Sequence, residues 1–281
     1  MTRKKLTILT LHDKKARGEP ISMVTAYDYP GALAADRAGL DSILVGDSLG
    51  MVVLGYDSTV PVTMDEMIHH CKAVRRGAQY AWLIGDMPFM SYQADRAEAI
   101  RNAGRFLKEG GMDAVKLEGG RAVADTVRAI TDAGIMVVGH IGLTPQSSAQ
   151  LGGYRVQGKT AADAQRLLED ALALQEAGAV MLVIEMVPDR VAARISRELR
   201  IPTIGIGAGA GCDGQVLVLH DLLGLFDRFT PKFVKKYAEL FLRMETALAE
   251  YRADLTARRF PAAEHSFALD DVEWAKWIGE Q

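Results

Sequence analysis

The sequence predicts an α/β fold, a single (β/α)8 TIM barrel with a long C-terminal helix and a short aromatic tail. Eight short apolar runs occur along the 281 residues, and most are separated by stretches with helical apolar spacing. Strands that alternate with helices form a parallel sheet, and eight such units can close into a barrel of about 250 residues. The expected strands span residues 21–26, 42–45, 82–85, 114–117, 136–139, 181–184, 203–206 and 215–219.

The apolar periodicity predicts helices between these strands and one longer helix near the C-terminus. The long helix is expected from Pro231 to about Arg258, with proline at a favoured first-turn position. We expect residues 1–267 to form one catalytic barrel domain and residues 268–281 to form a C-terminal extension, where a short amphipathic helix could dock on its own subunit or on a neighbour. The other expected helices span residues 31–38, 64–78, 94–108, 122–133, 161–177 and 188–198.

The composition is that of a globular protein with a sizeable core. Hydrophobic residues make up 49% and charged residues 25%, which argues against disorder and against a membrane protein. The net charge of −3 leaves no positive surplus for a nucleic-acid backbone, so we expect neither nucleic acid nor membrane as a partner. The first residues lack the apolar core of a signal peptide, which predicts a cytoplasmic location. Two cysteines are too few for a disulfide framework.

Five of the strand ends carry a polar or charged residue, and these predict one active site. Because a barrel gathers the carboxyl ends of its strands on one face, residues far apart in sequence become neighbours there. An alternative for each aspartate is a helix N-cap, whose oxygen accepts a backbone N–H. Glutamate is a poor N-cap, so the set favours a site. Its members are Asp47, Asp86, Glu118, His140 and Glu185.

The residue types at these strand ends predict a magnesium site. Asp47 and Asp86 each follow a glycine, which lets a ligand approach the backbone closely. Carboxylate oxygens without useful thiols suit Mg²⁺, which keeps several waters or substrate oxygens. Lys116 and Glu118 occupy alternate strand positions and project to the same side, where Glu118 can bind metal directly or through water. A structural Lys–Glu pair in the barrel core is the alternative.

The remaining groups predict acid–base chemistry. Glu185 ends an apolar run that would partly desolvate its carboxylate, which favours a role as a base. His140 could hydrogen-bond substrate, orient the base or be structural. Lys116 can stabilise an oxygen that becomes negative. A metal, a lysine and a carboxylate base together predict enolisation of a 2-oxo acid, whose adjacent carbon then attacks an electrophile.

Many segments, in the same order along the chain, resemble those of the 3-methyl-2-oxobutanoate hydroxymethyltransferases. This family is also called the ketopantoate hydroxymethyltransferases and is part of the phosphoenolpyruvate/pyruvate barrel superfamily. The resemblance includes Val45-Gly46-Asp47-Ser48 and Val115-Lys116-Leu117-Glu118 and ends near residue 267. The other similar segments are residues 23–28, 55–59, 85–89, 119–120, 139–146, 205–209, 213–215 and 264–267.

This resemblance implies transfer of a hydroxymethyl group from 5,10-methylenetetrahydrofolate to 3-methyl-2-oxobutanoate through a Mg-stabilised enolate. The product would be 2-dehydropantoate, in pantothenate and coenzyme A biosynthesis. Asp47 and Asp86 would bind Mg²⁺ with Glu118 as a further metal-site carboxylate, and Ser48 and Lys116 would contact the oxo acid. Glu185 would accept the proton. The family usually forms a homodecamer, sometimes an octamer, and we carry that over as an expectation.

Two other readings fit parts of this pattern. One is a carbon–carbon lyase or phosphonomutase of the same superfamily, which uses the same enolate without folate. Such lyases often carry a cysteine in a mobile loop, and residues 144–158 contain none. The other is a non-catalytic metabolite-binding barrel, which would have no need of Lys116 or Glu185. The segment Ala210-Gly211-Cys212 and the chain beyond Phe267 depart from the family pattern and leave the pterin contacts and assembly open.

Overall fold

The computed structural model describes residues 3–279 and contains a closed barrel of eight parallel strands that pair in chain order. This confirms the expected fold class. The strands end slightly later than expected at four positions, so Asp86, Glu118 and Glu185 are the last residues of their strands. The strands are β1 (Ile21–Thr25), β2 (Ser42–Val45), β3 (Trp82–Asp86), β4 (Ala114–Glu118), β5 (Val137–Gly142), β6 (Met181–Glu185), β7 (Thr203–Ile206) and β8 (Gly214–Leu217).

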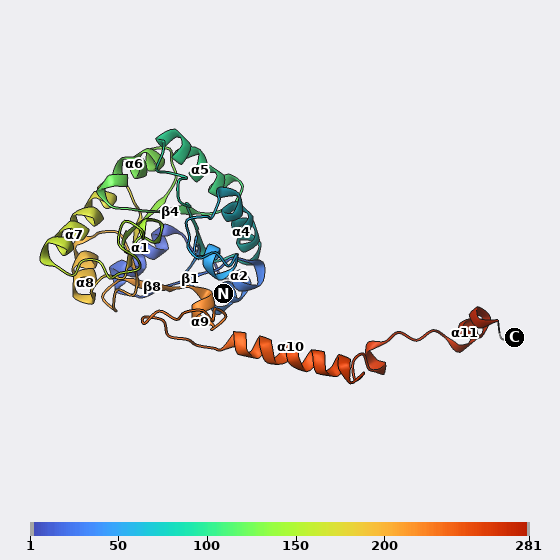
Figure 1. Cartoon of the computed structure of the whole chain (residues 1–281). Coiled ribbons are helices and arrows are strands. Elements are labelled where there is room, and N and C mark those ends of the chain that lie inside the picture. The colour runs from blue at the N-terminus through green and yellow to red at the C-terminus, as the bar shows by residue number, and fades with distance from the viewer. Residues whose placement is uncertain (1–2, 280–281) are drawn as a thin grey trace.

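A ring of helices surrounds the barrel, as Figure 1 shows. The six helices expected between the strands are all present, with bounds within two residues of those expected. They are α2 (Tyr29–Ala38), α4 (Met64–Gly77), α5 (Arg96–Lys108), α6 (Ala124–Asp132), α7 (Ala161–Glu176) and α8 (Asp189–Glu198). Shorter elements are α3 (Leu49–Val52), α9 (Leu219–Leu222), η1 (Arg121–Val123), η2 (Pro145–Ser147) and η3 (Ala263–His265).

Side-chain caps set the beginning of several of these helices. Asp28, Thr63, Asp95 and Thr160 each accept a hydrogen bond from a backbone N–H of the first turn of α2, α4, α5 and α7. Such a cap satisfies a backbone donor that has no partner inside the helix. The capping aspartates are therefore distinct from Asp47 and Asp86, which do not cap a helix in this way.

The core has two apolar layers, one inside the barrel and one between the strands and the outer helices. Leu44, Trp82 and Met181 are among the buried side chains that fill the interior, whereas Phe106 and Leu174 belong to the outer layer. Alternate residues of each strand supply the two layers, as expected for a barrel with a filled interior. The interior is therefore a packed support for the site and not a channel.

An N-terminal helix, α1 (Ile8–Arg17), closes the base of the barrel and was not expected from the sequence. Its Leu11 is fully buried among the interior side chains of the barrel. His12 Nε2 lies 2.9 Å from the carbonyl oxygen of Val180, immediately before β6. Three lysines before or within α1 contact aspartates that precede strands. These pairs are Lys5–Asp113 at 2.6 Å, Lys14–Asp41 at 2.6 Å and Lys15–Asp213 at 2.8 Å.

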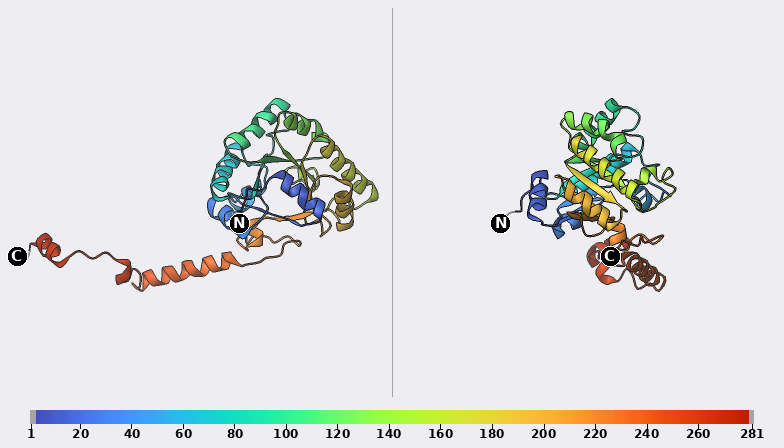
Figure 2. Two further views of the ribbon diagram at one scale, coloured as in Figure 1. Left: turned by 180° about the vertical axis from the view of Figure 1, so that it is seen from behind. Right: turned by 90° about the vertical axis from the view of Figure 1, so that its left-hand side faces the viewer.

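The long C-terminal helix, α10 (Leu240–Thr256), begins nine residues after Pro231, so the expected start was wrong. The backbone N–H groups of Tyr237, Leu240 and Phe241 donate to carbonyls of residues 222–224, at the end of α9. A helix that began at Pro231 would need these N–H groups for hydrogen bonds to carbonyls four residues earlier, so the helix begins only at Leu240. α10 extends away from the barrel and leads to α11 (Asp271–Ile278), the short helix expected in the tail (Figures 1 and 2).

Between residues 3 and 279, no helix is both long and apolar enough to cross a bilayer.

Candidate active site

The carboxyl ends of strands β2 to β5 bring together the charged residues singled out in the sequence. Because neighbouring strands of the barrel carry them, side chains up to 93 positions apart in the chain lie in one buried cluster, from Asp47 to His140. Each is at most 5% exposed. Burial of an unpaired charge is energetically costly, so these groups are expected either to pair with one another or to bind a ligand. The cluster consists of Asp47, Asp86, Lys116, Glu118 and His140.

Lys116 lies between two of the carboxylates. Its Nζ is 2.5 Å from Asp86 Oδ1 and 3.7 Å from Glu118 Oε1. The other Asp86 oxygen, Oδ2, accepts the backbone N–H of Asp47 at 3.1 Å. Burial lowers the pKa of the Lys116 ammonium, but the carboxylates of Asp86, Glu118 and Asp47 outweigh it and raise that pKa. Lys116 therefore remains a cation in this site.

His140 connects the buried cluster to Glu185. Its Nδ1 lies 3.4 Å from Glu118 Oε1, and its Nε2 lies 3.3 Å from Glu185 Oε2. The angles at both nitrogens fall short of hydrogen-bond geometry within the described residues, so these are ion-pair contacts. Burial and Lys116 lower the pKa of His140, but the carboxylates of Glu118 and Glu185 outweigh them and raise it to about 9. His140 is therefore a cation near neutral pH.

Glu185 is the most open of the predicted catalytic groups. It ends β6 beside β5, where Glu185 pairs with Gly142. Its side chain is 16% exposed, whereas that of His140 is 2% exposed. Glu185 thus lies at the rim, where its carboxylate can meet a ligand that enters from solvent.

Negative charge is concentrated at Asp47. Burial and the charges of Asp86 and Glu118 raise the pKa of Asp47 well above its usual value. The pKa of Asp86 is also raised by burial, although Lys116 partly offsets the effect. Burial acts on Glu118 in the same direction, but His140 and Lys116 lower its pKa overall. An additional cation near Asp47 and Asp86 would relieve this repulsion.

The carboxylates of Asp47 and Asp86 are the hard oxygen donors available for a metal ion at this site. Across residues 3–279, no three His, Cys, Asp or Glu side chains are arranged so that they could hold an ion together. Mg²⁺ is often held by only one or two carboxylates, with waters and substrate completing its shell. Asp47 and Asp86 offer such hard oxygens at a place with excess negative charge. These residues therefore fit Mg²⁺, and Glu118 as a further metal-site carboxylate stays a prediction.

Gln146 is a site residue that sequence reasoning missed. Its Nε2 donates to Asp47 Oδ2 and to the carbonyl of Met87, both at 2.9 Å. Its backbone N–H donates to Glu118 Oε2 at 3.0 Å, and Tyr92 OH donates to its Oε1 at 2.8 Å. Gln146 lies in the loop after β5, and that position was the available signal. It joins two carboxylates that come from different strands.

Ser48 lies beside the cluster, on the other side of Asp47. Its Oγ is 2.8 Å from Tyr27 OH, which accepts a hydrogen bond from Thr25 Oγ1 at 2.7 Å. Thr25 Oγ1 in turn accepts the backbone N–H of Leu219 at 3.0 Å. The hydroxyl of Ser48 is thus oriented by a chain of contacts that begins on β1. Sequence reasoning found Ser48 but not Tyr27.

The fold and the site together define a class of protein. A small anionic ligand at the mouth of the barrel would meet the Lys116 cation, the Asp47 and Asp86 carboxylates and the more open carboxylate of Glu185. A cation beside carboxylates, with a further carboxylate open to solvent, is an arrangement typical of enzymes that move a proton from a small anionic substrate.

Solved structures share this fold at low sequence identity. Phosphonopyruvate hydrolase in complex with oxalate and Mg²⁺ matches with a TM-score of 0.60 and 13% identity, over 98% of this chain and 95% of that one. A 2,3-dimethylmalate lyase, a member of the PEP mutase/isocitrate lyase superfamily, matches with a TM-score of 0.55 and 15% identity, over 97% and 94%. At such identities the likeness shows the fold alone.

Sequence comparisons show the family. The 3-methyl-2-oxobutanoate hydroxymethyltransferase of Moorella thermoacetica is 62% identical over 265 residues, covering 94% of this chain and 98% of that protein. The enzyme of the same name from Geobacillus kaustophilus is 57% identical, over 95% and 96%. A family model described as ketopantoate hydroxymethyltransferase matches residues 5–263. The chain belongs to the ketopantoate hydroxymethyltransferase family of enzymes.

Proposed function

We propose that this enzyme transfers a hydroxymethyl group from 5,10-methylenetetrahydrofolate to 3-methyl-2-oxobutanoate, giving 2-dehydropantoate for pantothenate and coenzyme A biosynthesis. Membership of the family supports the hydroxymethyl transfer to the oxo acid. The observation that carries the proposal is the contact of His140 with both Glu118 and Glu185, which couples a buried charged cluster to a more open carboxylate.

Glu185 is the base in this proposal. Its carboxylate accepts the proton on C3 of the oxo acid, because it is the strand-end carboxylate with the most open side chain. His140 Nε2 lies 3.3 Å from Glu185 Oε2, and this contact holds the carboxylate in place at the rim. His140 thus orients the base, the second of the roles considered for it from the sequence.

The buried cluster receives the negative charge that develops when the proton leaves. Asp47 and Asp86 would hold Mg²⁺, which when bound polarises the keto group of the oxo acid. Lys116, fixed against Asp86 at 2.5 Å, adds a positive charge next to that oxygen without a change of conformation. Ser48 donates its hydroxyl to the oxo acid at the rim. Four side chains on three strand ends then bind and orient one small substrate.

Carbon–carbon bond formation completes the reaction. Water adds to the one-carbon unit of the folate and both bonds from that carbon to nitrogen break, so each nitrogen takes up a proton of the water and the carbon is released at the oxidation level of formaldehyde. The deprotonated C3 attacks this carbon, and the oxygen that came from water becomes the hydroxyl. The products are 2-dehydropantoate and tetrahydrofolate. Among the residues of this chain, Glu185 holds the abstracted proton and can return it to that oxygen.

The assembly and location are part of the same proposal. We propose a homodecamer, with an octamer as the alternative, in the cytoplasm and without nucleic-acid or membrane partners. The apolar side chains exposed along α10 and in the tail, including Leu248 and Trp277, support contacts between copies.

Replacement of Glu185 tests the proposed proton step. Glu185→Gln should lower the exchange of the C3 proton of 3-methyl-2-oxobutanoate with solvent deuterium by about 100-fold or more, the contribution typical of a general base. Proton NMR measures the exchange, with and without Mg²⁺. Binding of the oxo acid in the presence of Mg²⁺ should remain, because the buried cluster is intact. Glu198→Gln, an exposed change on α8, is the control. Normal exchange in Glu185→Gln excludes Glu185 as the base.

A further inference from the structure

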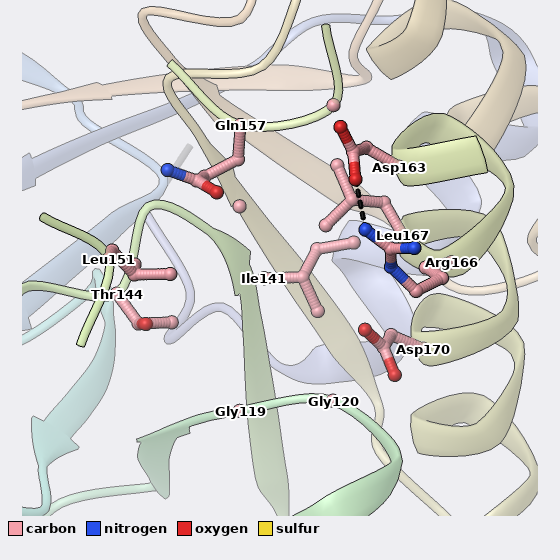
Figure 3. A pocket seen from close by; sticks show the side chains of 12 residues that line it. Gly119, Gly120, Ile141, Thr144, Leu151, Gln157, Asp163, Arg166, Leu167 and Asp170 are labelled. Carbon is pink, nitrogen blue, oxygen red and sulfur yellow. Dashed lines mark hydrogen bonds and ion pairs between the residues drawn. The ribbon is translucent and has the colours of Figure 1, made fainter. Parts of the chain in front are cut away.

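A cavity lies next to the mouth of the barrel, outside the charged cluster. It has a volume of about 320 Å³ and lies between α7 and the loops that follow β4 and β5 (Figure 3). Its walls combine apolar, polar and backbone surfaces, and the residues of the charged cluster do not line it. The residues that line it are Gly119, Gly120, Ile141, Gly142, Thr144, Leu151, Gln157, Gly158, Asp163, Arg166, Leu167 and Asp170.

The cavity shares backbone with the active site. Gly119 directly follows Glu118, and Ile141 directly follows His140. Gly142 pairs with Glu185 across β5 and β6, at a φ of +94°, and a Cβ on Gly142 would lie 2.2 Å from the carbonyl oxygen of Glu185. Only glycine can therefore bring the backbone this close. A ligand in the cavity would end one strand away from the proposed base.

We propose that this cavity binds the pterin ring of the folate substrate, an inference that rests on the proposed function. A reduced pterin is a compact bicyclic ring, and its pyrimidine edge carries N–H donors at N3 and at the 2-amino group. Ile141 and Leu167 supply apolar contacts to the faces of such a ring, and Asp170 supplies an acceptor at the cavity wall (Figure 3). The one-carbon unit, carried next to the ring, would then face the mouth of the barrel.

Asp170 has an oxygen available for the ring. Its Oδ1 accepts the backbone N–H of Arg121 at 2.9 Å, whereas its Oδ2 accepts no hydrogen bond from any group between residues 3 and 279. A carboxylate that accepts an N–H from a ligand makes a stronger hydrogen bond than a neutral acceptor does. The free oxygen of Asp170 is therefore suited to the donor edge of the pterin.

The charges in the cavity argue against binding of the other end of folate there, because that end carries the glutamate carboxylates. Asp163 and Asp170 line the cavity with a single cation, Arg166. Arg166 already pairs with Asp163, the contact drawn in Figure 3. An anionic tail would thus meet a net negative wall, whereas a neutral ring with N–H donors would not. The glutamate tail must then point out of the cavity.

Substitution of Asp170 tests the assignment. In Asp170→Asn the amide oxygen can still accept the N–H of Arg121, but the negative charge is lost. The dissociation constant of tetrahydrofolate by calorimetry and the KM for 5,10-methylenetetrahydrofolate should both rise by about 10-fold or more, as for loss of a hydrogen bond to a charged group. Solvent exchange of the oxo acid proton should stay unchanged. The control is Glu169→Gln, the adjacent residue on α7, which pairs with Arg121 at 2.9 Å and does not line the cavity.

A ligand that lacks the glutamate tail shows which end of folate binds in the cavity. 6-Methyltetrahydropterin should bind the wild-type enzyme. In Asp170→Asn its dissociation constant should rise by the same factor as that of tetrahydrofolate. If Arg166→Gln weakens tetrahydrofolate but not 6-methyltetrahydropterin, the cavity holds the tail and the inference is overturned. If the wild-type enzyme uses folate and Asp170→Asn behaves like Glu169→Gln, only the pocket assignment fails. A wild-type enzyme that neither binds nor uses folate overturns the proposed function as well.

Discussion

Gln146 shows how a neutral side chain can organise a cluster of charged ones. Its amide donates to Asp47 at 2.9 Å while its backbone N–H donates to Glu118 at 3.0 Å. A charged donor here would compete with Lys116, and an acid would add repulsion to a site where Asp47 already has a raised pKa. The side-chain amide fixes Asp47, and the backbone N–H of the same residue fixes Glu118, without a change in the net charge of the site.

Removal of this amide should loosen the binding site. Gln146→Ala leaves Asp47 and the carbonyl of Met87 without their donor, at a cost of about 1–3 kcal/mol in unfolding free energy. We expect the KM for the oxo acid to rise by about 10-fold, because Asp47 loses its fixed position. Steady-state kinetics and thermal unfolding measure the two effects. Gln150→Ala, an exposed change in the same loop, should alter neither. An unchanged KM in Gln146→Ala would contradict the positioning role.

Asp221, on α9, should make stability depend on pH. Burial raises its pKa to about 6, although Lys236 opposes the shift. Because the folded state then holds a proton that the unfolded state releases, the unfolding free energy falls as pH rises from about 4 to about 6. Asp221→Asn should therefore match wild type near pH 4 and exceed its melting temperature above pH 6. Asp227→Asn, an exposed neighbour, is the control. Equal differences at both pH values would count against this explanation.

Sequence reasoning found the ionisable residues of the site more readily than the neutral ones. Asp86, Glu118 and Glu185 stand out because a charge at the end of an apolar strand needs a partner. Gln146 and Tyr27 act through hydrogen bonds to groups distant in the chain, and no local pattern marks them. The contact of His140 with both Glu118 and Glu185 also depends on strand register and could not be derived from the residues alone.

At the scale of elements, α1 connects four alternate strands at the base of the barrel. Lysines and a histidine before or within α1 contact groups that immediately precede β2, β4, β6 and β8. Leu11 lies at the centre of this closure, fully buried against interior side chains. The lysine–aspartate pairs are partly shielded from water, so they add orientation to the apolar contact that Leu11 provides.

The contribution of Leu11 can be measured by a matched pair on the same helix. Leu11→Ala removes a fully buried side chain and should lower the unfolding free energy by about 2–5 kcal/mol. Leu9→Ala makes the same chemical change at a side chain that is 72% exposed and should have little effect. Denaturant unfolding followed by circular dichroism gives both values. Similar losses in the two variants would show that α1 does not close the barrel through Leu11.

Helices and strands were predicted correctly where the apolar pattern extended over many residues. The prediction failed where contacts with residues distant in the chain determine the helix bounds. The eight strands and six ring helices followed from pattern alone. α1 was missed because its polar residues pair with distant aspartates, so the helix lacks a wide apolar face. The start of α10 was misplaced because Tyr237 and its neighbours hydrogen-bond to the end of α9, which the sequence does not reveal.

At the scale of the whole molecule, α10 and the tail extend away from the barrel (Figure 2). Many of their apolar side chains are exposed to solvent. A helix of the ring follows each strand from β1 to β6, whereas none follows β7 and, up to residue 279, only the short α9 follows β8 in the ring (Figure 1). So many exposed apolar side chains in one part of a protein are typical of a surface that another protein covers. Contacts between copies of the chain, as proposed above, would cover it.

A charge placed on α10 tests the proposed assembly. Leu248 is 65% exposed, and Leu248→Glu should shift the enzyme toward smaller species because a carboxylate would be buried without a partner. Thr246→Glu, two residues earlier on the same helix, is the control. Light scattering after size exclusion gives the mass, and the wild-type decamer should have ten times the 30.5 kDa of one chain. A wild-type monomer, or an unchanged mass in Leu248→Glu, would contradict the role of α10.

The closure of the barrel base by α1 also fixes where an attached label would go. Residues that lead into α1 are tied to the end of the barrel opposite the strand-end carboxylates. A fluorophore or carrier protein fused ahead of Arg3 would therefore lie at the base of the barrel and leave the mouth accessible from solution. Immobilisation through that end would turn the opening of the attached barrel away from the solid support.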